Sequence, residues 1–158
     1  MSEEQQTKIT EDEKIEFFKC FLADKPYSQK ESLFDNKFEV AFRSLTVEES
    51  TDVFEQLRKD QIAGRLTNDA TYGLWLTNYR LALGITHINK EAFLPNITKD
   101  KYKPTGDDDS YIKAKAALFN TWNVFKLSAV ADSFKVFEDK IIQLTKEISN
   151  PAFWKAAQ

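Results

Sequence analysis

The side chains that could carry out chemistry are few and lie far apart in the sequence. His87 is the only histidine, and no nucleophile motif accompanies it as a general base would require. The run Asp107–Asp109 offers carboxylates to a hard cation, but it lacks the spaced ligands, central glycine and closing glutamate of a calcium loop. We interpret this run as the end of a solvated loop that leads into a helix. Neither feature favours an active site or a metal site.

The sequence also lacks clear motifs for binding a cofactor or for a cysteine nucleophile. The segment Lys103–Gly106 does not have the glycine spacing of a phosphate-binding loop, and four glycines in 158 residues disfavour a dinucleotide fold. Cys20, the single cysteine, falls on the apolar face of a predicted helix and is interpreted as a small core residue. We therefore predict a non-enzymatic protein with no catalytic residue, no cofactor and no metal.

Composition and charge fit one soluble domain. The chain is 42% hydrophobic and 13% aromatic, which is enough to build a core, and its net charge of −3 gives no basic footprint for nucleic acid. One cysteine excludes an internal disulfide, and no segment reaches the roughly 20 apolar residues that span a membrane. No signal-peptide pattern is present. We expect a cytoplasmic protein that binds neither nucleic acid nor membrane.

A heptad pattern near the C-terminal end organises the rest of the chain. Apolar residues recur there at spacings of three and four, which places them on one stripe of one helix. The stripe comprises Leu127, Val130, Phe134, Phe137, Ile141, Leu144 and Ile148. It is covered either by this chain or by another, and its phenylalanines favour an intramolecular face over a tight two-stranded coil. Ser128 is the predicted N-cap, and charged residues such as Lys140 are predicted for the helix surface.

Three earlier helices are predicted from side chains that can cap a first turn. The capping residues are Thr10 with Glu13, Thr46 with Glu49, and either Thr67 or Asn68. The predicted inner residues of the first helix are Ile15, Phe18, either Cys20 or Phe21, and Leu22, and those of the second are Val53, Phe54, Leu57 and Ile62. The third helix carries an aromatic stripe, Tyr72, Trp75, Leu76, Tyr79 and Leu83. We interpret this stripe as core, with a ligand pocket as the alternative.

One β-hairpin is predicted, over 29–34 and 37–44. Phe38, Val40 and Phe42 alternate with polar or small residues, and the pair Asp35-Asn36 suits the turn. A lone hairpin is only marginally stable, so its apolar face is predicted to lie on helices, and its free edge can accept another strand. The segment 85–93 forms either a second short hairpin or a loop.

These elements predict an α+β fold, mostly α, with one N-terminal β-hairpin packed on a bundle of about five helices. Residues 1–10 are predicted to be a flexible N-terminus and 11–150 a single globular domain. The loop 94–109 separates two helical halves, and 151–158 form an aromatic C-terminal tail.

Five apolar residues are the predicted partner-binding residues. Phe153 and Trp154 are aromatic anchors in the tail, because tryptophan dominates interface energetics. The alternative is that the tail folds back onto the domain. Phe134, Phe137 and Ile141 are included as candidate exposed members of the heptad stripe.

Three stretches of this sequence resemble the tail assembly chaperones of long-tailed bacteriophages. They are the strand and helix start at 38–49, the segment Asn78–Leu81 and the closing Asn150–Trp154. The resemblance implies a non-enzymatic protein of the host cell cytoplasm that binds the tape measure protein and aids assembly of the tail tube. Its implied partners are the tape measure or tube subunit, with self-association as a further option. A minor structural component of the virion, such as a tail connector or baseplate protein, is the alternative.

Overall fold

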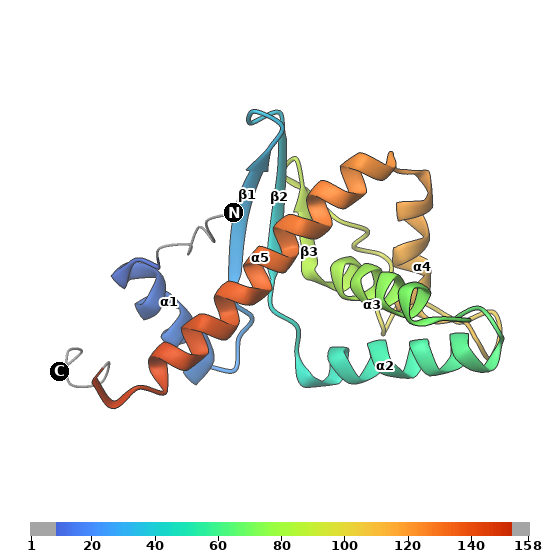
Figure 1. Cartoon of the computed structure of the whole chain (residues 1–158), viewed down its shortest axis with the longest axis horizontal. Helices are drawn as coiled ribbons and strands as arrows, with labels where there is room; N and C mark the ends of the chain where they lie inside the picture. The colour runs from blue at the N-terminus through green and yellow to red at the C-terminus, as the bar shows by residue number, and fades with distance from the viewer. Residues whose placement is uncertain (1–8, 153–158) are drawn as a thin grey trace.

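The computed structural model describes residues 9–152, which form five α-helices, one 3₁₀-helix and a four-stranded sheet (Figure 1). The elements are α1 (Glu11–Leu22), β1 (Ser28–Leu33), β2 (Phe38–Arg43), α2 (Val47–Ile62), α3 (Asp69–Gly84), β3 (Ile85–Ile88), β4 (Glu91–Ala92), α4 (Tyr111–Ala116), η1 (Ala117–Thr121) and α5 (Val124–Ile148). The predicted α+β class, mostly α with an N-terminal hairpin, is confirmed. In the described part of the chain, no helix is both long and apolar enough to cross a membrane.

The sheet is antiparallel with strand order β1-β2-β3-β4, so it is larger than the single predicted hairpin. The turn between β1 and β2 uses positive φ angles at Phe34, Asp35 and Asn36, which asparagine and aspartate tolerate. The segment 85–93, for which either a hairpin or a loop was predicted, is a hairpin. Asn89 and Lys90 adopt positive φ angles in the turn that connects β3 to β4.

Helix α5 lies diagonally across one face of the sheet (Figure 1), and its buried core residues are Val130, Phe134, Phe137, Leu144 and Ile148. The ring of Phe134 lies 5.2 Å from that of Phe42 on β2, and the ring of Phe137 lies 5.8 Å from the same ring. A Cβ atom on Gly84 would lie 2.3 Å from the Phe134 ring, so α3 can approach α5 this closely only through a glycine. The heptad stripe is therefore covered by this chain.

The capping signals predict three of the helix starts correctly. Thr46 forms a complete capping box with Glu49, and the side chains of Thr10 and Asn68 each accept a bond from the first turn of their helices. The prediction of Ser128 as a cap is wrong. Asn123 accepts a hydrogen bond from the N–H of Phe125 at 2.8 Å, and this cap lies five residues before the predicted one.

The predicted inner faces of α1 and α2 are partly wrong. Phe17 is the buried residue of α1, whereas Ile15 is exposed. Phe54 and Ile62 of α2 are exposed as well, although Val53 and Leu57 are fully buried as predicted. The burial of each face depends on which element packs there, and this information is not contained in the spacing of one helix.

The prediction that Lys140 lies on the helix surface is also wrong, because its side chain is buried. Its side chain is 5% exposed and forms an ion pair with Glu13 of α1. It also donates a hydrogen bond to Gln29 of β1 at 3.2 Å. Since α1 and β1 both pack against α5 at this level, the lysine links three elements instead of facing solvent.

The predicted loop 94–109 is held against α2 by polar contacts. Lys99 donates to Glu48 and Asp52 at 2.7 and 2.9 Å. Asp109 accepts a hydrogen bond from the Tyr102 hydroxyl at 2.6 Å, and Ser110 caps α4. The loop thereby joins the two helical halves of the chain. Of the predicted flexible N-terminus, residues 1–8 lie outside the described residues.

Candidate functional site

The connection between β2 and α2 lies within the segment 38–49 and is fixed by several hydrogen bonds. Ser44 donates its N–H to the carbonyl of Tyr27 at 2.8 Å and accepts the Tyr27 N–H on its hydroxyl at 2.9 Å. Arg43 donates to both carboxylate oxygens of Glu49, which also completes the capping box with Thr46. The connection therefore holds its side chains in one position on the surface.

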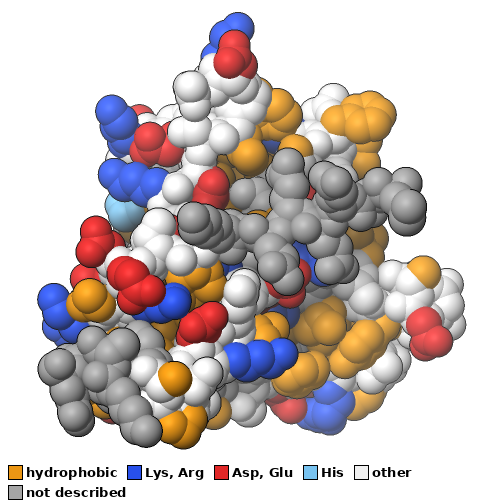
Figure 2. Space-filling model, turned by 60° about the vertical axis from the view of Figure 1, so that its left-hand side comes forward, with side chains coloured by type: hydrophobic (Ala, Val, Ile, Leu, Met, Phe, Trp, Pro, Cys, Tyr) orange, Lys and Arg blue, Asp and Glu red, His pale blue; other side chains and the backbone are white. Residues whose placement is uncertain are grey.

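A groove of about 620 Å³ lies between the C-terminal end of α1 and this connection. We call it the α1–α2 groove. Its apolar lining comprises Cys20, Phe21, Pro26, Leu45 and Val47. Phe21 is 53% exposed and Val47 is 85% exposed, so both present apolar surface to solvent. Asp24, Lys25 and Glu48 add charged groups of both signs to the lining. Hydrophobic side chains also reach the surface between charged ones on the face drawn in Figure 2.

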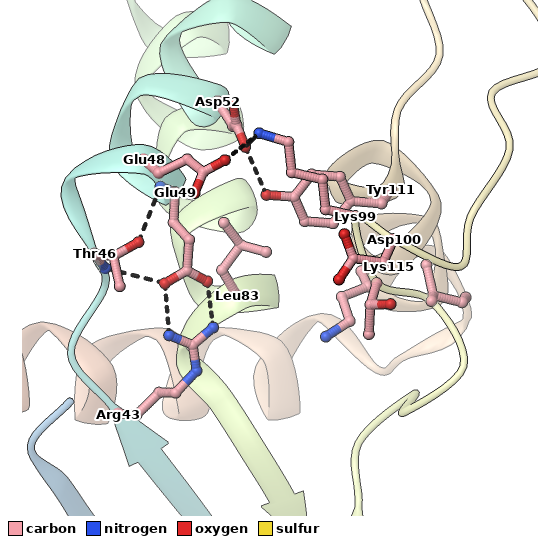
Figure 3. A pocket seen from close by; sticks show the side chains of 12 residues that line it. Arg43, Thr46, Glu48, Glu49, Asp52, Leu83, Lys99, Asp100, Tyr111 and Lys115 are labelled. Carbon is pink, nitrogen blue, oxygen red and sulfur yellow. Dashed lines mark hydrogen bonds and ion pairs between the residues drawn. The ribbon is translucent and has the colours of Figure 1, made fainter. Parts of the chain in front are cut away.

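A second hollow of about 350 Å³ lies beside the groove and shares Thr46 and Glu48 with it (Figure 3). We call it the polar cleft. Burial would raise the pKa of Glu49, but the hydrogen bonds from Arg43 and Thr46 outweigh burial and hold that pKa below its usual range. Hydrogen bonds to Glu48 and Asp52 raise the pKa of Lys99 to about 12. The acids and bases on this side of the cleft thus neutralise one another.

Lys115 is the exception in the polar cleft. It lines the cleft, as Figure 3 shows, and among the described residues it forms no ion pair. Its amine lies 5.8 Å from the centre of the Phe93 ring. Burial, together with the positive charge of Arg43, lowers the pKa of Lys115. No hydroxyl or thiol nucleophile is bonded to this amine within the described residues, so the arrangement resembles no nucleophile–base pair.

The aromatic stripe of α3 is divided between core and surface. Tyr79 and Leu83 are buried, as predicted for a core stripe, and Trp75 is partly buried against them. The Tyr79 hydroxyl donates to the buried carboxylate of Asp60, and burial together with this bond raises the tyrosine pKa. Trp75 also lines a pocket of about 300 Å³ with Arg65. The stripe is mostly structural, with this pocket at its outer edge.

The predicted partner-binding residues are not gathered into one surface. Phe134 and Phe137 are each 2% exposed and are core residues of this chain, so they are not the exposed stripe members that were predicted. Ile141 is partly buried against the same core. Phe153 and Trp154 lie outside the described residues. The stripe members fail as surface residues because α1, α3 and the sheet cover them.

The remaining chemical candidates are also accounted for. His87 is exposed on β3, with its Nδ1 atom 3.1 Å from the Thr86 hydroxyl. Asp108 pairs with Arg65 at 2.7 Å. Cys20 is partly buried, packs against the core and also lines the α1–α2 groove. Within residues 9–152, no three His, Cys, Asp or Glu side chains are grouped to hold a metal ion.

Sequence reasoning missed Phe21 and Val47 as surface residues. The available signal is positional, because Phe21 lies in the last turn of α1 and Val47 is the first residue of α2 after its cap. No protein-family model matches the chain, and no curated protein or solved structure matches it. The surfaces of this chain and its short sequence motifs are therefore the features that bear on its function.

Proposed function

We propose that this protein is a non-enzymatic chaperone of bacteriophage tail assembly that works in the host cell cytoplasm. In this proposal the α1–α2 groove binds an apolar segment of the tape measure protein or the tube subunit and keeps it soluble during assembly. The observation that carries the proposal is the exposure of Phe21 and Val47 in a groove that is lined in part by the segment 38–49, which resembles such chaperones.

The groove suits a client protein for a physical reason. Burying a fully exposed valine or phenylalanine side chain contributes about 1.5–3 kcal/mol. Val47 is 85% exposed and can supply most of its share, whereas Phe21 is 53% exposed and can supply about half. Most of the exposed lining is apolar, so the groove favours a client segment whose own apolar residues need cover from water. The rigid β2–α2 connection lowers the entropy lost on binding, because Val47 is already held in place.

The test uses two matched variants of the tagged chain. Val47→Asp places a charge in the groove and suits the helix, because aspartate is favourable in a first turn. Val124→Asp is the control: Val124 is also the first residue of its helix and is 69% exposed, but does not line the groove. Pull-down from infected cells is followed by mass spectrometry and by proteomics of purified virions.

The expected result is that the wild-type chain and Val124→Asp capture the tape measure protein or tube subunit, Val47→Asp loses it, and virions lack the chain. Capture that is equal for both variants overturns the role of the groove. A chain that is abundant in finished particles overturns the chaperone role and supports a minor structural component, such as a tail connector or baseplate protein.

A further inference from the structure

The outer edge of β1 carries a set of backbone groups that the sheet does not use. Among the described residues, β1 pairs only with β2, in the register Ser32↔Glu39 and Lys30↔Ala41. Glu39 directs its carbonyl to Asn89 and its N–H to the Asn89 side chain, and Ala41 directs its carbonyl to Thr86. Both residues therefore turn their backbone groups away from β1, towards β3.

Antiparallel pairing then fixes which β1 groups are free. Opposed residues alternate between pairs that exchange hydrogen bonds and pairs that do not. Because Glu39 and Ala41 face β3, the opposed Ser32 and Lys30 turn their N–H and C=O groups to the free edge, and Ser28 follows by the same alternation. The side chains of these three residues are all exposed. The free edge thus presents three sets of backbone groups with one positive charge at their centre.

A second copy of the chain does not suit this edge. In a symmetric antiparallel pair, two opposed residues place their side chains on the same face of the sheet. Because side chains alternate between faces along a strand, the residue numbers of two opposed residues must then add up to an even number. The two such registers that overlap most of β1 oppose Lys30 to Lys30 of the second copy, or Glu31 to Glu31. Like charges placed directly opposite destabilise a strand pair. The edge is therefore better matched to a different chain.

We propose that the β1 edge binds an extended acidic segment of a partner protein as a fifth, antiparallel strand, with an aspartate or glutamate opposite Lys30. Main-chain hydrogen bonds to Ser28, Lys30 and Ser32 supply the affinity, and the pairing of the carboxylate with Lys30 makes the edge prefer an acidic segment. Lys30 is exposed and forms no ion pair among the described residues, so its charge is available. This inference extends the proposed function with a second contact, and it rests on that function only in taking the ligand to be a protein.

The first measurement is residue-resolved hydrogen exchange with a capped, β-forming peptide of about six residues that has aspartate at its centre. We expect the peptide to slow exchange of the Ser28, Lys30 and Ser32 amides, and to leave Gln29 and Glu31 unchanged because β2 already protects them. No protection, or protection without this alternation, overturns the proposal. Slow exchange of the three amides before peptide is added also overturns it, because the edge would then be occupied already.

Variants locate the contact and test its charge. Ser32→Pro removes one outward N–H without removing a bond to β2, and it should weaken peptide binding about fivefold. Lys30→Glu should weaken binding of the aspartate peptide about threefold to tenfold and favour the same peptide with lysine at its centre. Lys37→Glu, an equal charge change in the exposed turn, is the control and should leave both affinities unchanged.

Two outcomes separate this inference from the proposed function. Equal affinity of Lys30→Glu for both peptides overturns the charge preference, and unchanged binding by Ser32→Pro overturns the edge as the site. Val47→Asp should bind the aspartate peptide as the wild-type chain does, since Val47 is in the groove. Loss of the phage client by Val47→Asp and loss of the peptide by Lys30→Glu therefore report on different surfaces.

Discussion

The α5 stripe and the α1–α2 groove are both apolar, yet only the stripe is covered by the chain itself. The stripe lies on a 25-residue helix with regular spacing, and its Phe134 and Phe137 pack on the sheet. The groove gathers Phe21 and Val47 from the end of one helix and the start of another. Regular periodicity therefore marks the core of this protein, and exposed apolar surface arises where residues fall outside a periodic face.

The position of Val47 shows how this difference arises. The inward face of α2 is formed by Val53 and Leu57, which are fully buried about two and three turns further along the helix. Val47 lies in the first turn, where Thr46 and Glu49 already fix the backbone through hydrogen bonds. The fold does not need its side chain in the core, and so the residue is free to contact another molecule.

A pair of equal substitutions gives the largest expected contrast between the two regions. Phe134→Ala should lower the free energy of unfolding by about 3–5 kcal/mol, because it leaves a cavity between α5 and the sheet. Phe21→Ala should lower it by less than about 1 kcal/mol, because the ring is already half exposed. Urea unfolding followed by circular dichroism measures both. Similar losses for the two variants would contradict the division into core and exposed groove.

Local signals explain why much of the fold was predictable. A cap such as Thr46 acts through bonds within its own first turn, and the alternation of Phe38, Val40 and Phe42 needs no distant partner to identify a strand. The turn residue Asn36 has the same local character. These features predicted the hairpin and three helix starts, while the pairing of β3 with β2 depends on contacts across more than forty residues.

The candidate site was less predictable, because it depends on which elements meet. Lys140 is a charged residue next to an apolar stripe, and only the arrival of α1 and β1 buries it. Phe17 is buried although the spacing in α1 favours Ile15. The groove exists because the end of α1 lies beside the start of α2. Its residues Phe21 and Val47 are twenty-six positions apart in the sequence. The spacing of apolar residues within one helix or strand does not indicate which other element packs against it.

Two glycines of α3 give an intermediate contrast with opposite signs. Gly84→Ala should destabilise the protein by about 1–3 kcal/mol, since its Cβ would overlap the Phe134 ring. Gly73→Ala should stabilise it by about 0.5–1 kcal/mol, because nothing lies within 4 Å and alanine is the better helix former. Thermal unfolding of both variants measures the difference.

The Phe134→Ala background provides the control for Gly84. Without the ring, the added methyl group has space, so Gly84→Ala should cost little there and the double-mutant cycle should show strong coupling. An undiminished cost in that background would show that the glycine is required by the backbone of α3 and not by the approach of α5.

The smallest expected effect concerns the polar contacts that fix the groove. The pKa of Glu49 is depressed in the folded state, so its contribution is present above its unfolded value of about 4.5 and is lost as pH falls through the folded value. Glu49→Gln should therefore cost about 1 kcal/mol at pH 7 and progressively less below about pH 4.5. Phe134→Ala should show no such convergence with the wild-type chain, because its core contacts carry no charge.

Urea unfolding of the wild-type chain, Glu49→Gln and the exposed-acid control Glu16→Gln, repeated from neutral to acidic pH, measures this effect. Glu16 is exposed and forms no ion pair among the described residues, so its variant should lose little stability relative to the wild-type chain. If Glu49→Gln runs parallel to wild type, the Arg43–Glu49 pair does not stabilise the connection. The rigidity of the groove would then come from the Thr46 cap and the Tyr27–Ser44 bonds, which do not titrate in this range.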